Sequence, residues 1–361
     1  MDAGRHVPLQ DYPARRIAII KPSALGDIIH SLPVLAALRR RYPAATIAWV
    51  VNQAYEGLLR GNPDLSFVIP FQRGAAQSGF LKAFWTYAEF SRRFRQEKFD
   101  LVVDLQGLLR SGLMAAGSGA ARRVGLSSAR EGAAWFYTDV VRVTDFHAIH
   151  AVERYWLVAE AFGVGDARKV FRVPLPEPEQ AWAAAFLGEC PRPWLVLGVG
   201  SRWITKRWPP EHFAVLAQRA LDRTGGTVIF VGGRDETTLA RATAGRLRGL
   251  TRDLTGCTTL PQLAALLSRA DVMIANDTGP LHLAAALGRP IVAPYTCTSV
   301  LLNGPYGTAG TAIETRVWCQ GSYVKRCRRL ECMTELTPDR LWPALEGVLE
   351  AWQRNSLSQA S

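Results

Sequence analysis

The sequence predicts an α/β protein built from two doubly wound domains, each with a parallel sheet. Short apolar segments alternate with helical patterns along the chain, which is typical of parallel strands covered by helices on both faces. A stretch with three prolines and two acidic residues, 171–180, is typical of an extended linker, and the alternation restarts after it. The length of 361 residues suits two domains.

In the first domain, residues 1–172, three apolar segments are predicted as strands and two longer patterns as helices. The predicted strands are 17–20, 46–51 and 101–104, and the predicted helices are 28–41 and 80–94. A short turn of small residues separates the first strand from the first helix.

The second domain, residues 181–338, repeats this alternation with four strands and four helices. The predicted strands are 194–198, 227–231, 272–275 and 291–293, and the helices centre on 212–221, 238–247, 261–268 and 281–287. A last helical stretch, in the tail 339–361, could pack on either domain. Open parallel sheets bind ligands at the carboxyl ends of their strands, so we expect both domains to present strand ends to a central cleft.

The chain is basic, with a formal net charge of +12. The residues up to Lys169 include 22 basic and 15 acidic side chains, which places +7 of this charge in the first half. Such a surface suits a partner with phosphates or carboxylates, whereas the absence of a long basic arm disfavours nucleic acid. No apolar run reaches the roughly 18 residues of a membrane helix and no signal peptide is evident, so we expect a cytoplasmic protein.

Asp27 is the single carboxylate in the stretch KPSALGDIIHSLP, where the first strand gives way to a helix. An acid in the first turn of a helix commonly complements the helix dipole, at about 0.3–1 kcal/mol. An acid held on a rigid strand end that faces a ligand could instead act as a general base. The small residues before it, including Ser23 and Gly26, would let backbone amides approach a bound oxygen. The residues alone leave both roles open.

A second polar group follows the predicted strand 272–275, in the stretch NDTGPLHL. Thr278 or Asp277 would make a good N-cap, and Pro280 suits the first turn of a helix. His282 lies four residues after Thr278, so both side chains point toward the start of the helix. An acid, a hydroxyl, free amides and an imidazole would then converge, which favours an anion site over an ordinary capped helix.

Two further loops at strand ends carry glycines and polar residues. Gly198 and Gly200 lack the third glycine of a dinucleotide-binding fingerprint, so this pattern is weak. Ser201 and Lys206 lie beyond the strand end, where a hydroxyl and an ammonium could hold a diphosphate. The stretch VGGRDE, 231–236, supplies acids that could accept from ribose hydroxyls.

Three of the six cysteines, Cys319, Cys327 and Cys332, lie near the end of the chain. Their spacing lacks the close pairs of zinc ribbons, and no histidine is nearby. We therefore expect ordinary reduced thiols rather than a metal site.

Seven stretches, in order and over most of the chain, resemble the heptosyltransferases of glycosyltransferase family 9. They are KPSALGDIIHSLPVLAALRRRYP, DLVVDLQGLLRSG, RRVGL, TKRWPPEHF, VGGRDE, NDTGPLHLAAALGRPIVAPY and KRCRRLECMTELTPDRL. The resemblance implies a GT-B fold of two Rossmann-like domains. It also implies inverting transfer of heptose from ADP-L-glycero-D-manno-heptose to the inner core (Kdo/heptose) of lipopolysaccharide, without a metal ion or cofactor.

Carried over by position, the resemblance makes Asp27 the general base and Lys206 the cation that stabilises the leaving ADP. It implies donor contacts for Ser201, Arg202, Lys206, Glu236, Thr258, Asp277, Thr278, Gly279 and His282, with Glu236 at the ribose and Thr258 near the adenine. It implies an anionic acceptor, lipid A with Kdo, which would meet Ser23, Gly26, Arg110, Arg122 and Arg123. The basic first half suggests transient docking on the inner face of the cytoplasmic membrane.

Two departures from the family pattern touch the implied donor site. Thr296-Cys297-Thr298 follows Tyr295 where many relatives have Gly-Pro-Thr, and Ser201-Arg202 stands where a first-type heptosyltransferase can have two threonines. A family 9 transferase with another nucleotide sugar or glycan acceptor is therefore the main alternative. A nucleotide-sugar epimerase and a non-catalytic nucleic-acid or lipid binder are further alternatives, although a binder would not need a base at Asp27.

Overall fold

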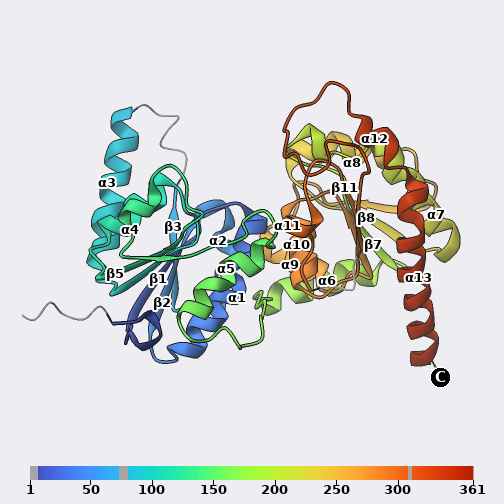
Figure 1. Ribbon diagram of the computed structural model, residues 1–361. Coiled ribbons are helices and arrows are strands. Elements are labelled where there is room, and N and C mark those ends of the chain that lie inside the picture. The colour runs from blue at the N-terminus through green and yellow to red at the C-terminus, as the bar shows by residue number, and fades with distance from the viewer. Residues whose placement is uncertain (1–6, 73–79, 308–310, 361) are drawn as a thin grey trace, which may run out of the picture. The chain divides into compact units, whose positions relative to one another are not determined.

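The computed structural model describes residues 7–72, 80–307 and 311–360. The chain forms two compact units, Met1–Pro174 and Leu175–Ser361, which we call the N-terminal and C-terminal units (Figure 1). Each unit is a parallel six-stranded sheet with helices on both sides, which confirms the predicted fold class.

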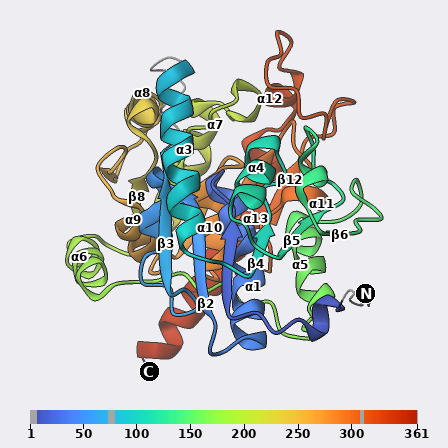
Figure 2. The same cartoon turned by 90° about the vertical axis from the view of Figure 1, so that its left-hand side faces the viewer.

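In the N-terminal unit the strand order is β3-β2-β1-β4-β5-β6, and all pairs are parallel. The strands are β1 Arg16–Ile20, β2 Thr46–Asn52, β3 Phe67–Phe71, β4 Leu101–Asp104, β5 Arg122–Leu126 and β6 Asp139–Val141. The helices are α1 Leu25–Arg41, α2 Glu56–Leu59, α3 Phe80–Gln96, α4 Leu109–Gly117 and α5 Ala151–Ala161, with short 3₁₀ turns at Leu9–Asp11, Gln53–Tyr55 and Ala133–Phe136. Helices α3 and α4 lie on one face of the sheet, and α1 and α5 lie on the other (Figures 1 and 2).

The central strands of this sheet are buried because both of their faces are covered. Residues 17–20 of β1 are fully buried, and the same holds for most of β2 and β4. Phe94 of α3 packs in one apolar cluster with Ile20, Val50 and Val102 of the three central strands. All three strands and both helices predicted for this half are present.

The C-terminal unit has the strand order β12-β11-β10-β7-β8-β9, again all parallel. The strands are β7 Trp194–Gly198, β8 Thr227–Phe230, β9 Leu250–Asp253, β10 Val272–Ala275, β11 Ile291–Tyr295 and β12 Thr311–Glu314. The helices are α6 Glu177–Gly188, α7 Pro210–Thr224, α8 Thr237–Ala244, α9 Leu260–Leu267, α10 Gly279–Ala286, α11 Val300–Asn303, α12 Glu331–Glu335 and α13 Pro338–Ala360, with 3₁₀ turns at Ile204–Lys206 and Arg234–Glu236. The four predicted strands and the predicted helices are all found.

The C-terminal helix α13 belongs to the C-terminal unit, a point that the sequence left open. It packs against α7, and its residues Leu341, Leu345 and Leu349 join Trp208 in the main apolar cluster of that unit. Spacing by four residues places the three leucines on one face of the helix.

The predicted extended linker 171–180 is wrong in its second half, where α6 begins at Glu177. Pro176 is the N-cap of this helix and Pro178 lies in its first turn. Proline is tolerated there because the first backbone N–H groups of a helix have no partner within it. In the described part of the chain, no helix is both long and apolar enough to cross a membrane.

Candidate active site

Both sheets share one strand order, so both have a topological switch point at equivalent places. In the N-terminal unit it lies between β1 and β4, and in the C-terminal unit between β7 and β10. Open α/β sheets bind ligands outside the carboxyl ends of the strands at such points. The segments that follow β1, β7 and β10 carry Asp27, Lys206 and Asp277, the residues that the sequence singled out.

Asp27 lies in the first turn of α1 and is partly exposed. One carboxylate oxygen, Oδ2, accepts a hydrogen bond from the backbone N–H of Ala24 at 3.2 Å, as expected for an acid at a helix start. The other, Oδ1, accepts from the hydroxyl of Tyr155 on α5 at 3.3 Å. The carboxylate is thus held in one orientation by two donors while its partial exposure leaves it open to a ligand.

Lys21, the residue after β1, is a buried cation behind Asp27. Its side chain is 3% exposed, and Nζ donates to the Tyr155 hydroxyl at 2.8 Å and to the Leu105 carbonyl at 3.1 Å. Burial alone would lower the pKa of Lys21, but Tyr155 and the negative charge of Asp27 outweigh it, so the net shift is upward. Lys21 therefore stays protonated, and its charge reaches Asp27 through the Tyr155 hydroxyl.

Burial raises the pKa of Tyr155 and outweighs the opposite effect of the nearby Lys21 ammonium, while Asp27 adds a smaller rise. The phenol consequently keeps its proton at neutral pH. It can accept from Lys21 and donate to Asp27 at the same time.

The loop after β4 supports the turn that precedes Asp27. Asp104 is buried at the end of β4, where Oδ1 accepts from the Gln106 backbone N–H at 2.8 Å and Oδ2 accepts from the Tyr137 hydroxyl at 2.7 Å. The Gln106 side chain in turn accepts from the backbone N–H of Ser23 at 3.4 Å. Gly125 in β5 is required here, because a Cβ at that position would lie 2.1 Å from the Tyr137 ring.

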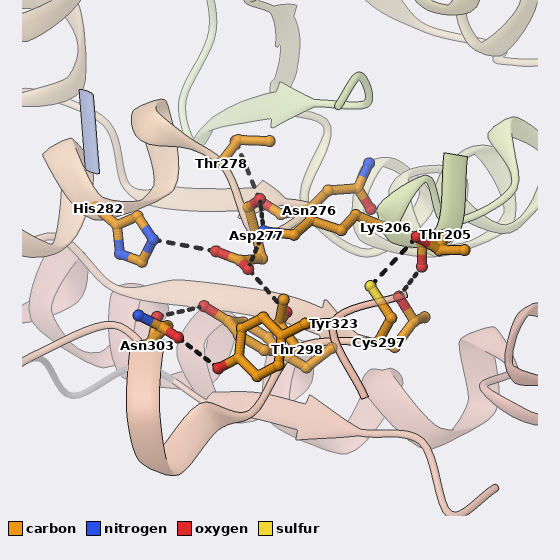
Figure 3. A network of polar contacts seen from close by, with 12 residues as sticks. Thr205, Lys206, Asn276, Asp277, Thr278, His282, Cys297, Thr298, Asn303 and Tyr323 are labelled. Carbon is orange, nitrogen blue, oxygen red and sulfur yellow. Dashed lines mark hydrogen bonds and ion pairs between the residues drawn. The ribbon is translucent and has the colours of Figure 1, made fainter. Parts of the chain in front are cut away.

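In the C-terminal unit, Asp277 is the centre of a buried ionic cluster at the end of β10 (Figure 3). Oδ2 accepts from Lys206 Nζ at 2.5 Å and from the Thr298 hydroxyl at 2.8 Å, and Oδ1 lies 3.1 Å from His282 Nε2. Burial by itself would raise the pKa of Asp277, but the hydrogen bond from His282 and the charge of Lys206 hold it well below its usual range. Asp277 is therefore ionised and fixes the position of Lys206.

Lys206 is held on a second side by an aromatic ring. Its ammonium lies 4.7 Å from the centre of the Trp203 ring, and the side chain keeps 17% of its surface exposed. A cation so placed is anchored from within the unit but can still meet an anionic ligand.

Asn276 joins the ends of β7 and β10. Its Oδ1 accepts from the backbone N–H of Trp208 at 3.0 Å, and its Nδ2 donates to the carbonyls of Val199 at 2.9 Å and Gly200 at 3.2 Å. The loop between β7 and α7, which carries Lys206, is fastened in this way to the strand that carries Asp277.

Glu236 covers the glycines of two strand-end loops. Its Oε2 accepts from the Gly233 backbone N–H at 2.9 Å, and a Cβ at Gly200 or Gly232 would meet its carboxyl group at 2.1 or 2.2 Å. Gly200 is thus needed for the approach of Glu236. Burial raises the pKa of this carboxyl group, although the Gly233 amide offsets part of the effect.

The start of α10 has no side-chain cap. Thr278 is the N-cap, but its hydroxyl donates to the Asn276 carbonyl at 3.1 Å and makes no capping bond to the helix. The amides of the first turn, at Gly279 and beyond Pro280, are therefore left without a side-chain cap, which is the arrangement that binds anions.

Comparison with known proteins places the chain in a family. The glycosyltransferase family 9 (heptosyltransferase) model matches residues 87–333, well over half of the chain. The chain belongs to glycosyltransferase family 9. It is accordingly a glycosyltransferase enzyme.

Individual relatives agree over nearly the whole chain. Lipopolysaccharide heptosyltransferase 1 of Pseudomonas aeruginosa is 31% identical over 367 aligned residues, which cover 93% of this chain and 98% of that protein. The crystal structure of a family 9 glycosyl transferase from Veillonella parvula superposes with a TM-score of 0.81 at 23% identity, over 93% of this chain and 98% of that one. The Escherichia coli heptosyltransferase WaaC, solved with ADP, gives 0.71 at 25% identity, over 92% and 99%. The GT-B fold is thereby established.

Several residues that the sequence proposed for donor binding lie together in the family 9 enzyme. Lys206, Asp277 and His282 are in contact, and Thr278 and Gly279 begin the adjacent helix α10. Ser201 is buried where β7 ends and Arg202 beside it is exposed, whereas Thr258 lies in the loop between β9 and α9. The Asp277 carboxylate faces Lys206, His282 and Thr298, so its oxygens are engaged within the C-terminal unit and hold these side chains in place.

Two of the predicted acceptor contacts make hydrogen bonds within the N-terminal unit, and burial leaves Arg122 little surface for a ligand. Arg122 is buried, and its guanidinium donates to both carboxylate oxygens of Asp139, at 2.5 and 2.8 Å. Arg123 donates from Nε to the Phe136 carbonyl at 2.8 Å. Both lie on β5, a strand that the sequence patterns did not indicate, so their engagement could not be foreseen. Arg110, exposed in the first turn of α4, remains a candidate.

Sequence reasoning missed Lys21, Tyr155, Asn276 and Thr298. Lys21 offered a signal, because a lysine that directly ends an apolar strand needs a buried partner. Tyr155 offered none, since it meets Asp27 across 128 positions of the chain.

Thr296 and Cys297, which differ from the family pattern, contact the loop that carries Lys206. The Thr296 hydroxyl donates to the Thr205 carbonyl at 2.5 Å, and the Cys297 thiol lies 3.4 Å from the Thr205 hydroxyl, next to Lys206. These residues therefore pack on the loop that carries Lys206.

The cysteines form no metal site in the described part of the chain, where no group of three or more His, Cys, Asp or Glu is arranged to hold a metal ion. All six cysteines are free thiols. Burial, with smaller contributions from the nearby Cys319, Cys297 and Cys327, raises the pKa of Cys332 to about 11, so this thiol stays protonated at neutral pH.

Proposed function

We propose that this enzyme is an inverting heptosyltransferase, which moves heptose from ADP-L-glycero-D-manno-heptose to the inner core (Kdo/heptose) of lipopolysaccharide with Asp27 as general base. The observation that carries the proposal is the pair of prepared sites at the two switch points, a held carboxylate after β1 and an anchored ammonium after β7. The names of the curated relatives, lipopolysaccharide heptosyltransferases, support the choice of sugar and acceptor.

In the proposed reaction, Asp27 removes the proton of the acceptor hydroxyl as that oxygen attacks the anomeric carbon. The new glycosidic bond forms while the bond from the anomeric carbon to the ADP oxygen breaks, and ADP leaves with the electron pair. Attack opposite the leaving group inverts the anomeric configuration. The partial exposure of Asp27 and its fixed orientation suit this role.

The negative charge that develops on ADP requires stabilisation, and the C-terminal unit supplies it. The diphosphate would be faced by Lys206, the Ser201 hydroxyl and the amides at the start of α10. Each well-placed hydrogen-bond donor of this kind stabilises a transition state by about 3–4 kcal/mol. Asp277 and His282 keep Lys206 in place. We propose that Glu236 binds the ribose, that the backbone near Thr258 meets the adenine, and that no metal or cofactor takes part.

A family 9 transferase with another nucleotide sugar is the second candidate. Thr296 and Cys297, which differ from the family pattern, contact Thr205 beside Lys206 and so touch the proposed donor site. A change there can alter the donor sugar without changing the fold.

The decisive experiment is to incubate the protein with ADP-heptose and a truncated lipid acceptor and to measure the mass of the product by mass spectrometry. We expect a mass increase of one heptose and release of ADP that depends on the acceptor. Transfer of a different sugar from a donor panel would support the second candidate. Donor turnover without any acceptor would point to an epimerase instead.

We also propose that the enzyme works at the inner face of the cytoplasmic membrane as a peripheral protein, where its lipid-linked acceptor would be presented. The net charge of +12 supports attraction to an anionic surface.

A further inference from the structure

A basic hollow lies beside the loop that carries Lys206 in the C-terminal unit. It has a volume of about 590 Å³ and is lined by two chain segments, 202–207 and 325–328. Five of its seven lining residues are cationic, namely Arg202, Arg207, Lys325, Arg326 and Arg328, and none is acidic.

The two segments are fastened to each other, so the hollow is a built feature of the fold. The Thr205 hydroxyl donates to the Val324 carbonyl at 2.6 Å, and the Tyr323 backbone N–H donates to the Cys297 carbonyl at 2.8 Å. Lys325 lies 5.2 Å from the centre of the Trp203 ring, which also contacts Lys206. Trp203 therefore joins the hollow to the proposed donor site.

The charges of the hollow are not balanced by ion pairs among the described residues, although the charge of Arg207 acts on the Glu236 carboxyl group. Among the residues that the structure describes, none of the five cations is paired with a carboxylate, whereas the neighbouring Arg329 is paired with Glu331 at 2.8 Å. Five like charges around one hollow repel one another, and an anion bound there would relieve this repulsion. Arginine in particular binds phosphate and carboxylate through two parallel hydrogen bonds.

We infer that this hollow is a second anion-binding site, which takes the phosphate or carboxylate groups of the acceptor. This inference rests on the proposed function. The volume lies in the range of about 300–1,000 Å³ that is typical of small-molecule sites, so it suits a phosphorylated sugar rather than a single ion. In the proposed function the donor diphosphate would meet Lys206 and the α10 amides, so the segment 325–328 is surplus to donor binding. Arg202, which the resemblance places at the donor, also lines the hollow.

The test compares Arg326→Gln/Arg328→Gln with Arg329→Gln, a matched control whose arginine is adjacent but lies outside the lining and is already paired. For the double variant we expect the KM for a phosphorylated lipid acceptor to rise about tenfold, because charge-assisted hydrogen bonds are lost. Its kcat and its KM for ADP-heptose should stay unchanged. Thermal unfolding of all three proteins checks that each is folded.

Two results would overturn the inference. A rise in the KM of the double variant for ADP-heptose would show that the hollow binds the donor. If the double variant has the same kinetics as Arg329→Gln, the hollow binds neither substrate. An acceptor treated with phosphatase gives a second comparison. Loss of the phosphates should raise the KM of the wild type for the acceptor and leave that of the double variant unchanged.

A binding measurement separates this inference from the proposed function. If the protein transfers no heptose, micelles of the phosphorylated lipid are titrated into the full-length protein without donor, and dephosphorylated micelles serve as the control. If the double variant binds phosphorylated micelles more weakly than Arg329→Gln does, the hollow is an anion-binding site, whichever reaction the enzyme catalyses. Equal binding by both variants overturns it.

Discussion

At the scale of single residues, the site depends on charges that are held by neighbours rather than left in water. Asp27 is oriented by Ala24 and Tyr155, and Lys206 is oriented by Asp277. Groups fixed in this way need little reorganisation during a reaction, which is the main source of electrostatic catalysis.

Asp27→Asn tests the general base directly. The amide keeps the size and the contact with Ala24 but cannot accept a proton, so we expect turnover to fall by about 10²–10⁴-fold. The fold and ADP-heptose binding should be retained, as measured by thermal unfolding and calorimetric titration. Near-normal rates in this variant would refute the assignment.

Tyr155→Phe tests the buried link between Lys21 and Asp27. Removal of the hydroxyl leaves the Lys21 ammonium with the Leu105 carbonyl alone, so the free energy of unfolding should drop by about 1–3 kcal/mol. Urea unfolding measures the change. The double variant Lys21→Met/Tyr155→Phe removes the buried charge as well and should be more stable than Tyr155→Phe. If it is less stable, Lys21 does not depend on Tyr155.

Gly200→Ala tests the place of Glu236 in the donor site. The new methyl group would displace the Glu236 carboxyl group, which is the mobile end of its side chain, so the cost in stability should be small. The KM for ADP-heptose should rise. Gly347→Ala on α13, where a Cβ meets no other atom within 4 Å, is the control and should leave KM unchanged. An unaltered KM in Gly200→Ala would remove Glu236 from the donor site.

At the scale of elements, edge strands account for most of what the sequence patterns missed. The undetected strands β3, β6, β9 and β12 are the outermost strands of the two sheets. An edge strand is only partly covered, so β6, β9 and β12 carry polar residues and lack the continuous apolar run that marks a central strand. The edge strand β3 is apolar throughout, FVIPF, but it contains Pro70, which disfavours a strand in a sequence pattern. The remaining missed strand is β5. It begins with two charged residues, Arg122 and Arg123, so its apolar run is too short to predict a buried strand.

Asp277→Asn tests the tie between the elements β10 and β7, and it has a defined pH dependence. The folded pKa of Asp277 is lowered, so its carboxylate contributes stability above the unfolded value of about 3.9. That contribution is lost as the pH falls through the folded pKa. At pH 7 the variant should lose roughly 3–5 kcal/mol of unfolding free energy, because Lys206 is left unpaired.

Urea unfolding of wild type and Asp277→Asn at pH 7 and at pH 3 measures this dependence. The difference between the two proteins should be larger at pH 7. An equal difference at both values would show that the Asp277 charge does not stabilise the fold.

At the scale of the whole molecule, the net charge of +12 bears on where the enzyme works. Each basic residue near an anionic bilayer contributes about 1 kcal/mol to binding, and salt screens this attraction. The full-length protein should therefore sediment with vesicles that contain anionic lipid at low salt, and much less at high salt. Vesicles of zwitterionic lipid are the control, and no binding to anionic vesicles at low salt would count against membrane docking.

The sequence by itself determined the two parallel sheets and the loops that carry Asp27, Lys206 and Asp277. Apolar runs, helix starts and strand-end loops are local features, and parallel strands necessarily place their carboxyl ends at one edge. The tertiary structure alone decided which distant residues meet at those loops. It brought Tyr155 to Asp27 and turned Arg122 inward to Asp139, because strand order and helix packing are set by the whole core rather than by any single stretch.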